Sequence, residues 1–154
     1  MMYLTEAQAQ KTANIRRILD EMIEGYGLTD EAAFNANAAK INRNADAFRV
    51  YKPDKDYVRG DVVVNPADDI PYWAMHNHGP STGQVHEPSM KSTIWTHCHG
   101  TTPGTAREFI AEGHNPYMAG HYCRENGVIA LCNTDYTVHP PSVLPQAWTF
   151  VPAE

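Results

Sequence analysis

Apolar residues in the first third of the chain recur at the three-and-four spacing of an amphipathic helix. Thr5 and Gln8 fit a capping box at the start of this pattern, and Gly25 and Gly27 end it. The apolar stripe between them consists of Ile15, Ile18, Leu19, Met22, Ile23 and Tyr26. The pattern predicts one amphipathic helix with a single face to bury.

A second helical pattern follows directly in the alanine-rich stretch "EAAFNANAAKINRNADAF". It is predicted to start at Thr29 or Asp30, and its apolar face consists of Phe34, Ile41, Ala45 and Phe48. Two consecutive helices predict a helical hairpin. Because such a hairpin buries little area by itself, we expect its apolar stripe to pack on the rest of the chain or on copies of itself.

From Tyr51 onward the pattern changes to short β-strands separated by turns. The segments "YVRGDVVVN", "IPYWAMHN" and "STIWTHC" predict three strands, separated by "PADD" and by the Gly/Pro/Ser-rich stretch after His78. A similar arrangement follows in "PYMAGHYCRENGVIALCNTDY", where Asn126-Gly127 is typical of a type I′ hairpin turn. The pattern therefore predicts two small β modules.

The two modules share a sequence repeat. Tyr57 and Gly60 correspond to Tyr117 and Gly120, and Val63 to Cys123, at an offset of 60. The pentapeptide "VHEPS" at 85–89 corresponds to "VHPPS" at 138–142 at an offset of 53, and Trp95-Thr96 matches Trp148-Thr149 at that same offset. The same features recur in one order, which indicates a tandem duplication.

These patterns predict an α+β fold with three parts. Residues 1–49 form an N-terminal helical hairpin that serves as the assembly region. Residues 50–100 and residues 101–154 form two duplicated three-stranded antiparallel β modules.

The layout resembles tail-associated phage proteins described as carbohydrate-binding or chitin-binding-like, in which a short helical region precedes two small β modules. In the first module the matching residues are Tyr57, Gly60, Asp61, Val63, Tyr72, His78, His86, Pro88, Ile94 and Trp95. In the second module they are "EGHNPYMAG", Asn126-Gly127, His139, Pro141 and Trp148. His86 and His139 stand where the family usually carries tryptophan in its W-x-P turns, and tryptophan is the better platform for a sugar ring.

The resemblance implies a non-enzymatic structural or accessory component of a phage or phage-like tail, at the virion surface or tip. It would be made in the host cytoplasm. Its implied partners are other virion or tail proteins, cell-surface polysaccharide and copies of itself, with a trimer built on the Ile15–Tyr26 stripe. A soluble carbohydrate-binding module without an assembly role is the alternative within the same class.

Composition and charge exclude other classes of partner. The formal net charge of -6 argues against nucleic acid and anionic membranes, which both favour a basic face. No segment approaches the roughly 18 consecutive apolar residues of a membrane span. Cys98, Cys123 and Cys132 are odd in number and show no CxxC spacing, so we expect reduced, partly buried thiols.

Five of the eight histidines lie between residues 74 and 100 and raise the question of a metal site. His76 with His78, and His97 with His99, have the two-residue spacing that places both side chains on one face of a strand. A small metal-dependent hydrolase using these four residues is therefore a third hypothesis. No acidic residue is clearly placed as a further ligand or general base, and no G-x-S-x-G motif is present. We therefore assign no catalytic residue, metal ligand or cofactor.

Aromatic and histidine side chains are the candidate contacts for a glycan or a partner protein. The candidates are Tyr72, Trp73, His78, His86, Tyr136 and His139. Trp73 and Tyr136 are the ones that we expect to be exposed. Trp95 and Trp148 close the last strand of each module and are predicted to be structural core residues.

Overall fold

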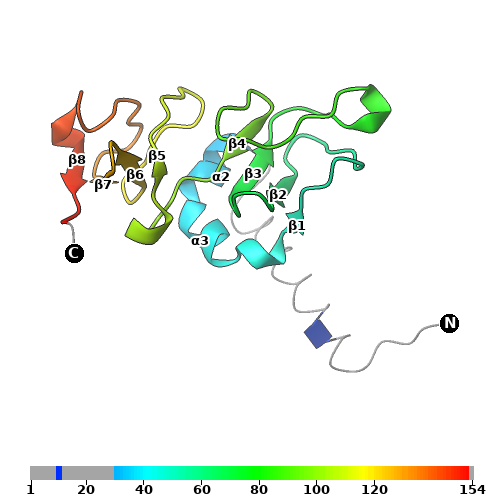
Figure 1. Cartoon of the computed structure of the whole chain (residues 1–154), viewed down its shortest axis with the longest axis horizontal. Helices are drawn as coiled ribbons and strands as arrows, with labels where there is room; N and C mark the ends of the chain where they lie inside the picture. The colour runs from blue at the N-terminus through cyan, green and yellow to red at the C-terminus, as the bar shows by residue number, and fades with distance from the viewer. Residues whose placement is uncertain (1–9, 12–29, 153–154) are drawn as a thin grey trace.

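The computed structural model of the 154-residue chain describes residues 10–11 and 30–152. The described part is a mixed α+β structure, mostly β, with helices α2 and α3 and two four-stranded sheets (Figure 1). The stripe from Ile15 to Tyr26 lies outside these residues, so the first helix of the predicted hairpin stays a prediction. None of the described helices is long and apolar enough to cross a bilayer.

The helical region that precedes the first sheet is divided into short pieces. It consists of α2 (Glu31–Ala36), α3 (Ala38–Arg43) and a 3₁₀ turn (Ala45–Ala47). The start is as predicted, since the Asp30 carboxylate accepts a hydrogen bond from the Ala33 amide at 2.7 Å. The prediction of one continuous helix is wrong. The break falls at Asn37, whose φ of -102° and ψ of 20° depart from helical values, while its side chain donates a hydrogen bond to the Ala33 carbonyl at 2.8 Å.

The two sheets have the same strand order and the same strand directions. The first contains β1 (Arg49–Val50), β2 (Val62–Val64), β3 (Pro71–Ala74) and β4 (Trp95–His97). The second contains β5 (Arg107–Glu108), β6 (Tyr122–Glu125), β7 (Val128–Cys132) and β8 (Trp148–Phe150). In each sheet the first strand is parallel to the second, and the other pairs are antiparallel.

The prediction of three-stranded antiparallel modules is therefore corrected to four-stranded mixed sheets. The strands that the sequence analysis missed are β1 and β5. Each has only two residues, which is too short for an alternating pattern to be recognised. Their equivalent places are clear from the register, since Arg49 pairs with Val63 and Arg107 pairs with Cys123.

Each sheet carries the same tryptophan contact at its last strand. The Trp95 indole nitrogen donates to the His86 carbonyl at 2.8 Å, and the Trp148 indole nitrogen donates to the His139 carbonyl at 2.9 Å. Both rings are almost fully buried, and each belongs to the apolar core of its own module. A buried indole N–H needs an acceptor, which the carbonyl before the proline-containing turn provides in both modules.

Apolar side chains cover the first sheet on both faces and the second sheet on one. One cluster, between the helices and the first sheet, consists of Phe34, Ala38, Ile41, Phe48, Val62, Trp73 and Cys98. The cluster on the opposite face consists of Tyr51, Tyr57, Val63, Ile70, Tyr72, Ala74 and Trp95. The cluster of the second sheet consists of Tyr117, Cys123, Ala130, Cys132, Ala147 and Trp148. Because consecutive residues of a strand point to opposite faces, Tyr72 and Trp73 belong to different clusters.

Candidate functional site

The structure places two of the predicted ligand contacts inside the molecule. Tyr72 and Trp73 are both 0% exposed. The expectation that Trp73 is exposed is wrong, because α2 and α3 cover the sheet face on which it lies. Its ring also contacts the guanidinium of Arg59, which lies 4.8 Å from the ring centroid. Neither aromatic ring offers a free face to a sugar.

Two of the predicted histidine contacts lie beside the first module's tryptophan. His78 is buried, and its ring meets the Trp95 ring edge-on at a centroid distance of 4.8 Å. His86 is half-buried, with its ring 5.9 Å from that of His78. His139, the counterpart of His86, is exposed. The structure thus brings His78 and His86 together at the edge of a core.

Tyr136 is the predicted aromatic contact that is exposed to solvent. Its side chain is 75% exposed, and its backbone has a left-handed φ of 60°. It lies at a pocket of about 700 Å³ between α2 and the second β module. The residues that line this pocket include Asp30, Glu31, Asn35, His114, Met118 and Tyr136. We call this hollow the Tyr136 pocket.

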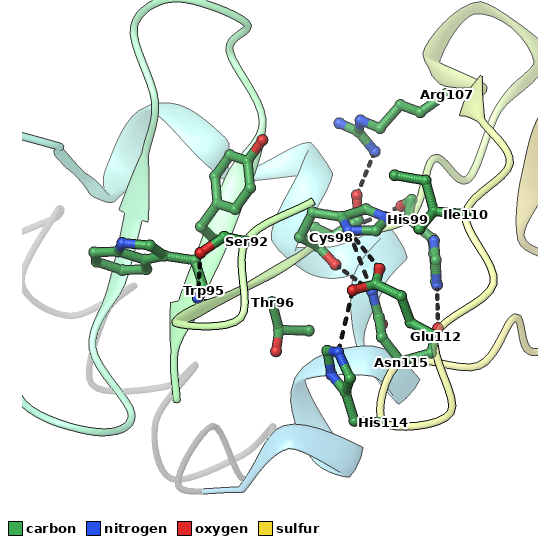
Figure 2. Close-up of polar contacts among 12 residues, drawn as sticks. Ser92, Trp95, Thr96, Cys98, His99, Arg107, Ile110, Glu112, His114 and Asn115 are labelled. Atoms are coloured by element: carbon green, nitrogen blue, oxygen red, sulfur yellow. Dashed lines mark hydrogen bonds and ion pairs between the residues drawn. The ribbon is translucent and has the colours of Figure 1, made fainter. Parts of the chain in front are cut away.

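A chain of carboxylates and imidazoles fixes the polar side of the Tyr136 pocket. His114 lies between two carboxylates. Its Nε2 is 3.1 Å from Glu112 Oε2 (Figure 2), and its Nδ1 is 3.3 Å from Glu31 Oε1. The second oxygen of Glu31 accepts a hydrogen bond from the Thr96 hydroxyl at 2.5 Å. Because the carboxylates contact opposite nitrogens of one ring, they orient the imidazole and do not converge on a shared point.

Three buried imidazoles lie behind this chain, where the two modules meet. His97 Nδ1 is 3.3 Å from Glu112 Oε1, and the ring of His99 stacks on Tyr117 at a centroid distance of 3.9 Å. The third imidazole belongs to His121, whose ring lies 5.2 Å from that of His99. All three rings are at least 96% buried, so they serve as packing groups that join the modules.

Burial also decides the charge of these imidazoles. Burial, with a smaller contribution from the positive charge of Arg107, lowers the pKa of His97 to about 3. The pKa of His121 falls to about 4 for the same main reason, and burial holds that of His99 well below its ordinary value. The three rings are therefore neutral at neutral pH. Burial raises the pKa of Glu112, while the adjacent His114 opposes that shift.

The four histidines of the hydrolase hypothesis do not form one site. His76 is exposed and His78 packs on Trp95, whereas His97 and His99 pack at the junction between the modules. Among residues 10–11 and 30–152, no group of three or more His, Cys, Asp or Glu side chains is arranged to hold a metal ion. The structure therefore gives the metal-dependent mechanism no geometric support.

Sequence reasoning missed most of the Tyr136 pocket. Asp30 was assigned only as a helix start, and Glu31, Asn35 and Met118 were not singled out. One position of the pocket, His114, could have been noticed from the repeat. At the offset of 60 that relates the two modules, the first copy has Asp54 where the second has His114, so this position departs from the repeat.

Comparisons with known proteins assign no family to this arrangement. No protein-family model matches the chain, and no match was found among curated proteins. The chemistry of the Tyr136 pocket is therefore inferred from its own side chains.

Proposed function

We propose that the chain is a non-enzymatic accessory component of a phage or phage-like tail, and that the Tyr136 pocket is its contact for carbohydrate. The observation that carries this proposal is the exposed ring of Tyr136 at a pocket that also contains carboxylate and amide groups. Sugar recognition combines a flat aromatic face, which packs on the apolar face of a pyranose, with polar groups that bind hydroxyls.

The dimensions of the pocket fit a small saccharide. Its volume of about 700 Å³ lies within the range of roughly 300–1,000 Å³ that is typical of small-molecule sites. The Glu31 carboxylate and the His114 imidazole are held in place by each other and by Thr96. A polar group that is already oriented loses little conformational entropy when a ligand binds, which favours affinity.

The proposal also includes the origin of the two modules and the helical hairpin at the N-terminus. We infer that the two β modules descend from one duplicated unit and that an N-terminal helical hairpin precedes them. The identical strand order of the sheets and the matched indole–carbonyl hydrogen bonds of Trp95 and Trp148 support the duplication. In a virion, several copies of a weak glycan contact would act together and raise the overall binding strength.

Replacing Tyr136 tests the carbohydrate contact. In a glycan array or polysaccharide pull-down with the full chain, Tyr136→Ala is expected to reduce binding by about tenfold, because the stacking surface is lost. The matched control is Phe150→Ala, which removes another exposed aromatic ring, 54% exposed on β8 and outside the pocket lining. Unchanged binding by Tyr136→Ala, or an equal loss in both variants, would contradict the assignment of the pocket.

A further inference from the structure

One imidazole connects helix α2 to the second β module. His114 lies in the segment between β5 and β6, and Glu31 is the first residue of α2. The His114 Nε2 is 3.1 Å from Glu112 Oε2, which belongs to the same segment (Figure 2). Its Nδ1 is 3.3 Å from Glu31 Oε1, which lies across the junction. The ring therefore stands between a carboxylate of α2 and a carboxylate of the second module.

The contacts of the two carboxylates continue to strand β4. The other oxygen of Glu31 accepts a hydrogen bond from the Thr96 hydroxyl at 2.5 Å, and the other oxygen of Glu112 is 3.3 Å from His97 Nδ1. Thr96 and His97 are consecutive residues of β4. These side chains, together with His114, form a closed ring of contacts that joins β4, α2 and the segment between β5 and β6.

The two contacts of His114 depend on the charge of its ring. A protonated imidazole has an N–H on both nitrogens and a positive charge, so it attracts both carboxylates. A neutral imidazole has one N–H, and the lone pair of its other nitrogen then faces a carboxylate without a proton between them. The side chains of Glu31 and Glu112 are 18% and 11% exposed, so water screens this repulsion only in part.

The other groups that face His114 do not replace its positive charge. Asp30, which caps α2, lines the Tyr136 pocket beside it and adds a further carboxylate. His97 faces it from β4 and is neutral at neutral pH, because burial lowers its pKa to about 3. Within the described part of the chain, the lining of the pocket contains neither lysine nor arginine. The proton of His114 is therefore the charge that offsets these carboxylates.

We propose that a proton on His114 holds α2 against the second module, and that loss of this proton loosens the junction. Because histidines exchange a proton near neutral pH, the junction is tight in weak acid and looser at pH 8. The hydrogen bond from the Asn35 side chain to the Pro116 carbonyl is uncharged and keeps the two parts in contact at either pH. The loosening is therefore local. It does not depend on the proposed carbohydrate contact.

Glu112 sets the lower end of the pH range in which the junction is tight. Burial raises the pKa of this carboxyl group, while the adjacent His114 opposes that shift. As the pH decreases below weak acid, Glu112 takes up a proton and its attraction to the imidazolium is lost. The contact is therefore strongest in weak acid and weaker on both sides of it.

Hydrogen exchange on the full chain, followed by NMR, measures the loosening. The reporter is the Asn115 amide, which donates to the Glu112 carbonyl at 3.1 Å next to His114. Its protection factor, corrected for the intrinsic effect of pH on exchange, is expected to fall about threefold from pH 6 to pH 8, as the loss of one partly exposed ion pair predicts. A protection factor that is equal at both pH values, or higher at pH 8, would overturn the proposal.

Three variants assign the pH effect to the His114 contacts. His114→Gln stays polar without the charge, so the Asn115 amide is expected to have the same low protection factor at both pH values. Glu31→Gln keeps an oxygen for the Thr96 hydroxyl but removes the charge across the junction, and is expected to reduce the pH effect. The matched control is His139→Gln, an exposed histidine of the same module outside the pocket lining, which is expected to keep the threefold change. A threefold change that persists in His114→Gln would show that another group causes it and would overturn the proposal.

Discussion

Three buried histidines at the junction between the modules make the free energy of unfolding depend on pH. His97, His99 and His121 are buried without charge, and burial lowers the pKa of each. His99 keeps a hydrogen bond to the Asn115 carbonyl at 2.8 Å, and His121 accepts one from the Met118 amide at 3.0 Å. Protonating any of these rings in place would bury a charge in a region with little water.

Acidification is therefore expected to destabilise the fold. In the unfolded chain a histidine has a pKa of about 6.5, so below that pH the unfolded chain binds protons that the folded chain excludes. The free energy of unfolding falls as the pH decreases from about 6.5 toward the folded-state pKa of His97, about 3. Each histidine that stays neutral contributes up to about 1.4 kcal/mol per pH unit. Urea unfolding at several pH values measures how steeply the free energy of unfolding changes with pH.

Two variants test whether the buried histidines cause the free energy of unfolding to fall with pH. His121→Gln is expected to reduce this fall, whereas His76→Gln, at an exposed position, is expected to leave it unchanged. Glu112 acts in the opposite direction, because its raised pKa lets the folded state bind a proton first as the pH falls. Three histidines outweigh this single carboxyl group. A free energy of unfolding that is constant down to about pH 5 would show that the buried imidazoles do not control stability.

At the scale of elements, the segment that joins β4 to β5 holds the two modules together. The Gly100 carbonyl accepts a hydrogen bond at 2.8 Å from the amide of Tyr122, the first residue of β6. The same glycine lies directly against the backbone of Thr105, and a Cβ at residue 100 would overlap the Thr105 carbonyl. The close approach of the two chain segments therefore requires glycine at this position.

Adding a methyl group at two glycines of this segment tests that requirement. Gly100→Ala is expected to lower the free energy of unfolding by about 1–3 kcal/mol, because the backbone must move to relieve the overlap. Gly104→Ala is the matched control, since nothing lies within 4 Å of the added carbon, and its effect is expected to stay within about 0.5 kcal/mol. Thermal and urea unfolding provide the measurement. Equal free energies of unfolding for the two variants would mean that the segment accommodates the added methyl group without loss of stability.

The sequence was a good guide to elements that depend on local patterns. The Asn126-Gly127 turn joins β6 and β7 with left-handed φ values of 53° and 79°, as an Asn-Gly hairpin predicts. Asp30 begins α2 as predicted. The predictions that were wrong depend either on contacts between distant parts of the chain or on the geometry of a single residue. The burial of Trp73 depends on helices that pack from outside its module, and the helix break is a change of backbone angles at the single residue Asn37.

At the scale of the whole molecule, the Tyr136 pocket could not be predicted because its walls come from distant parts of the chain. Asp30 caps α2 and Glu31 begins it, whereas His114 and Tyr136 belong to loops of the second module. No periodicity or motif relates these positions. The exposure of Tyr136 was expected from its type and place, but the carboxylates and amide around it depend on how the helices and modules pack.

The proposed assembly role predicts an oligomer in solution. The Ile15–Tyr26 stripe lies outside the described residues, and its sequence pattern predicts an apolar face that pairs with copies of itself. Light scattering on the full chain is expected to give three times the 17.2 kDa chain mass. Ile18→Lys should lower this mass, because a charge in the stripe opposes association. A monomer at micromolar concentration that still binds glycan would instead favour a free carbohydrate-binding module.

The Tyr136 pocket and the two sheet cores share no residue. Asn35, Met118 and the other lining side chains lie on α2 or on loops, while the clusters around Trp95 and Trp148 hold the sheets. Under the proposed function, substitutions at exposed lining positions such as Tyr136 can change the ligand without touching either sheet core. For the proposed carbohydrate contact, this separation allows binding specificity to evolve while the two sheets stay intact.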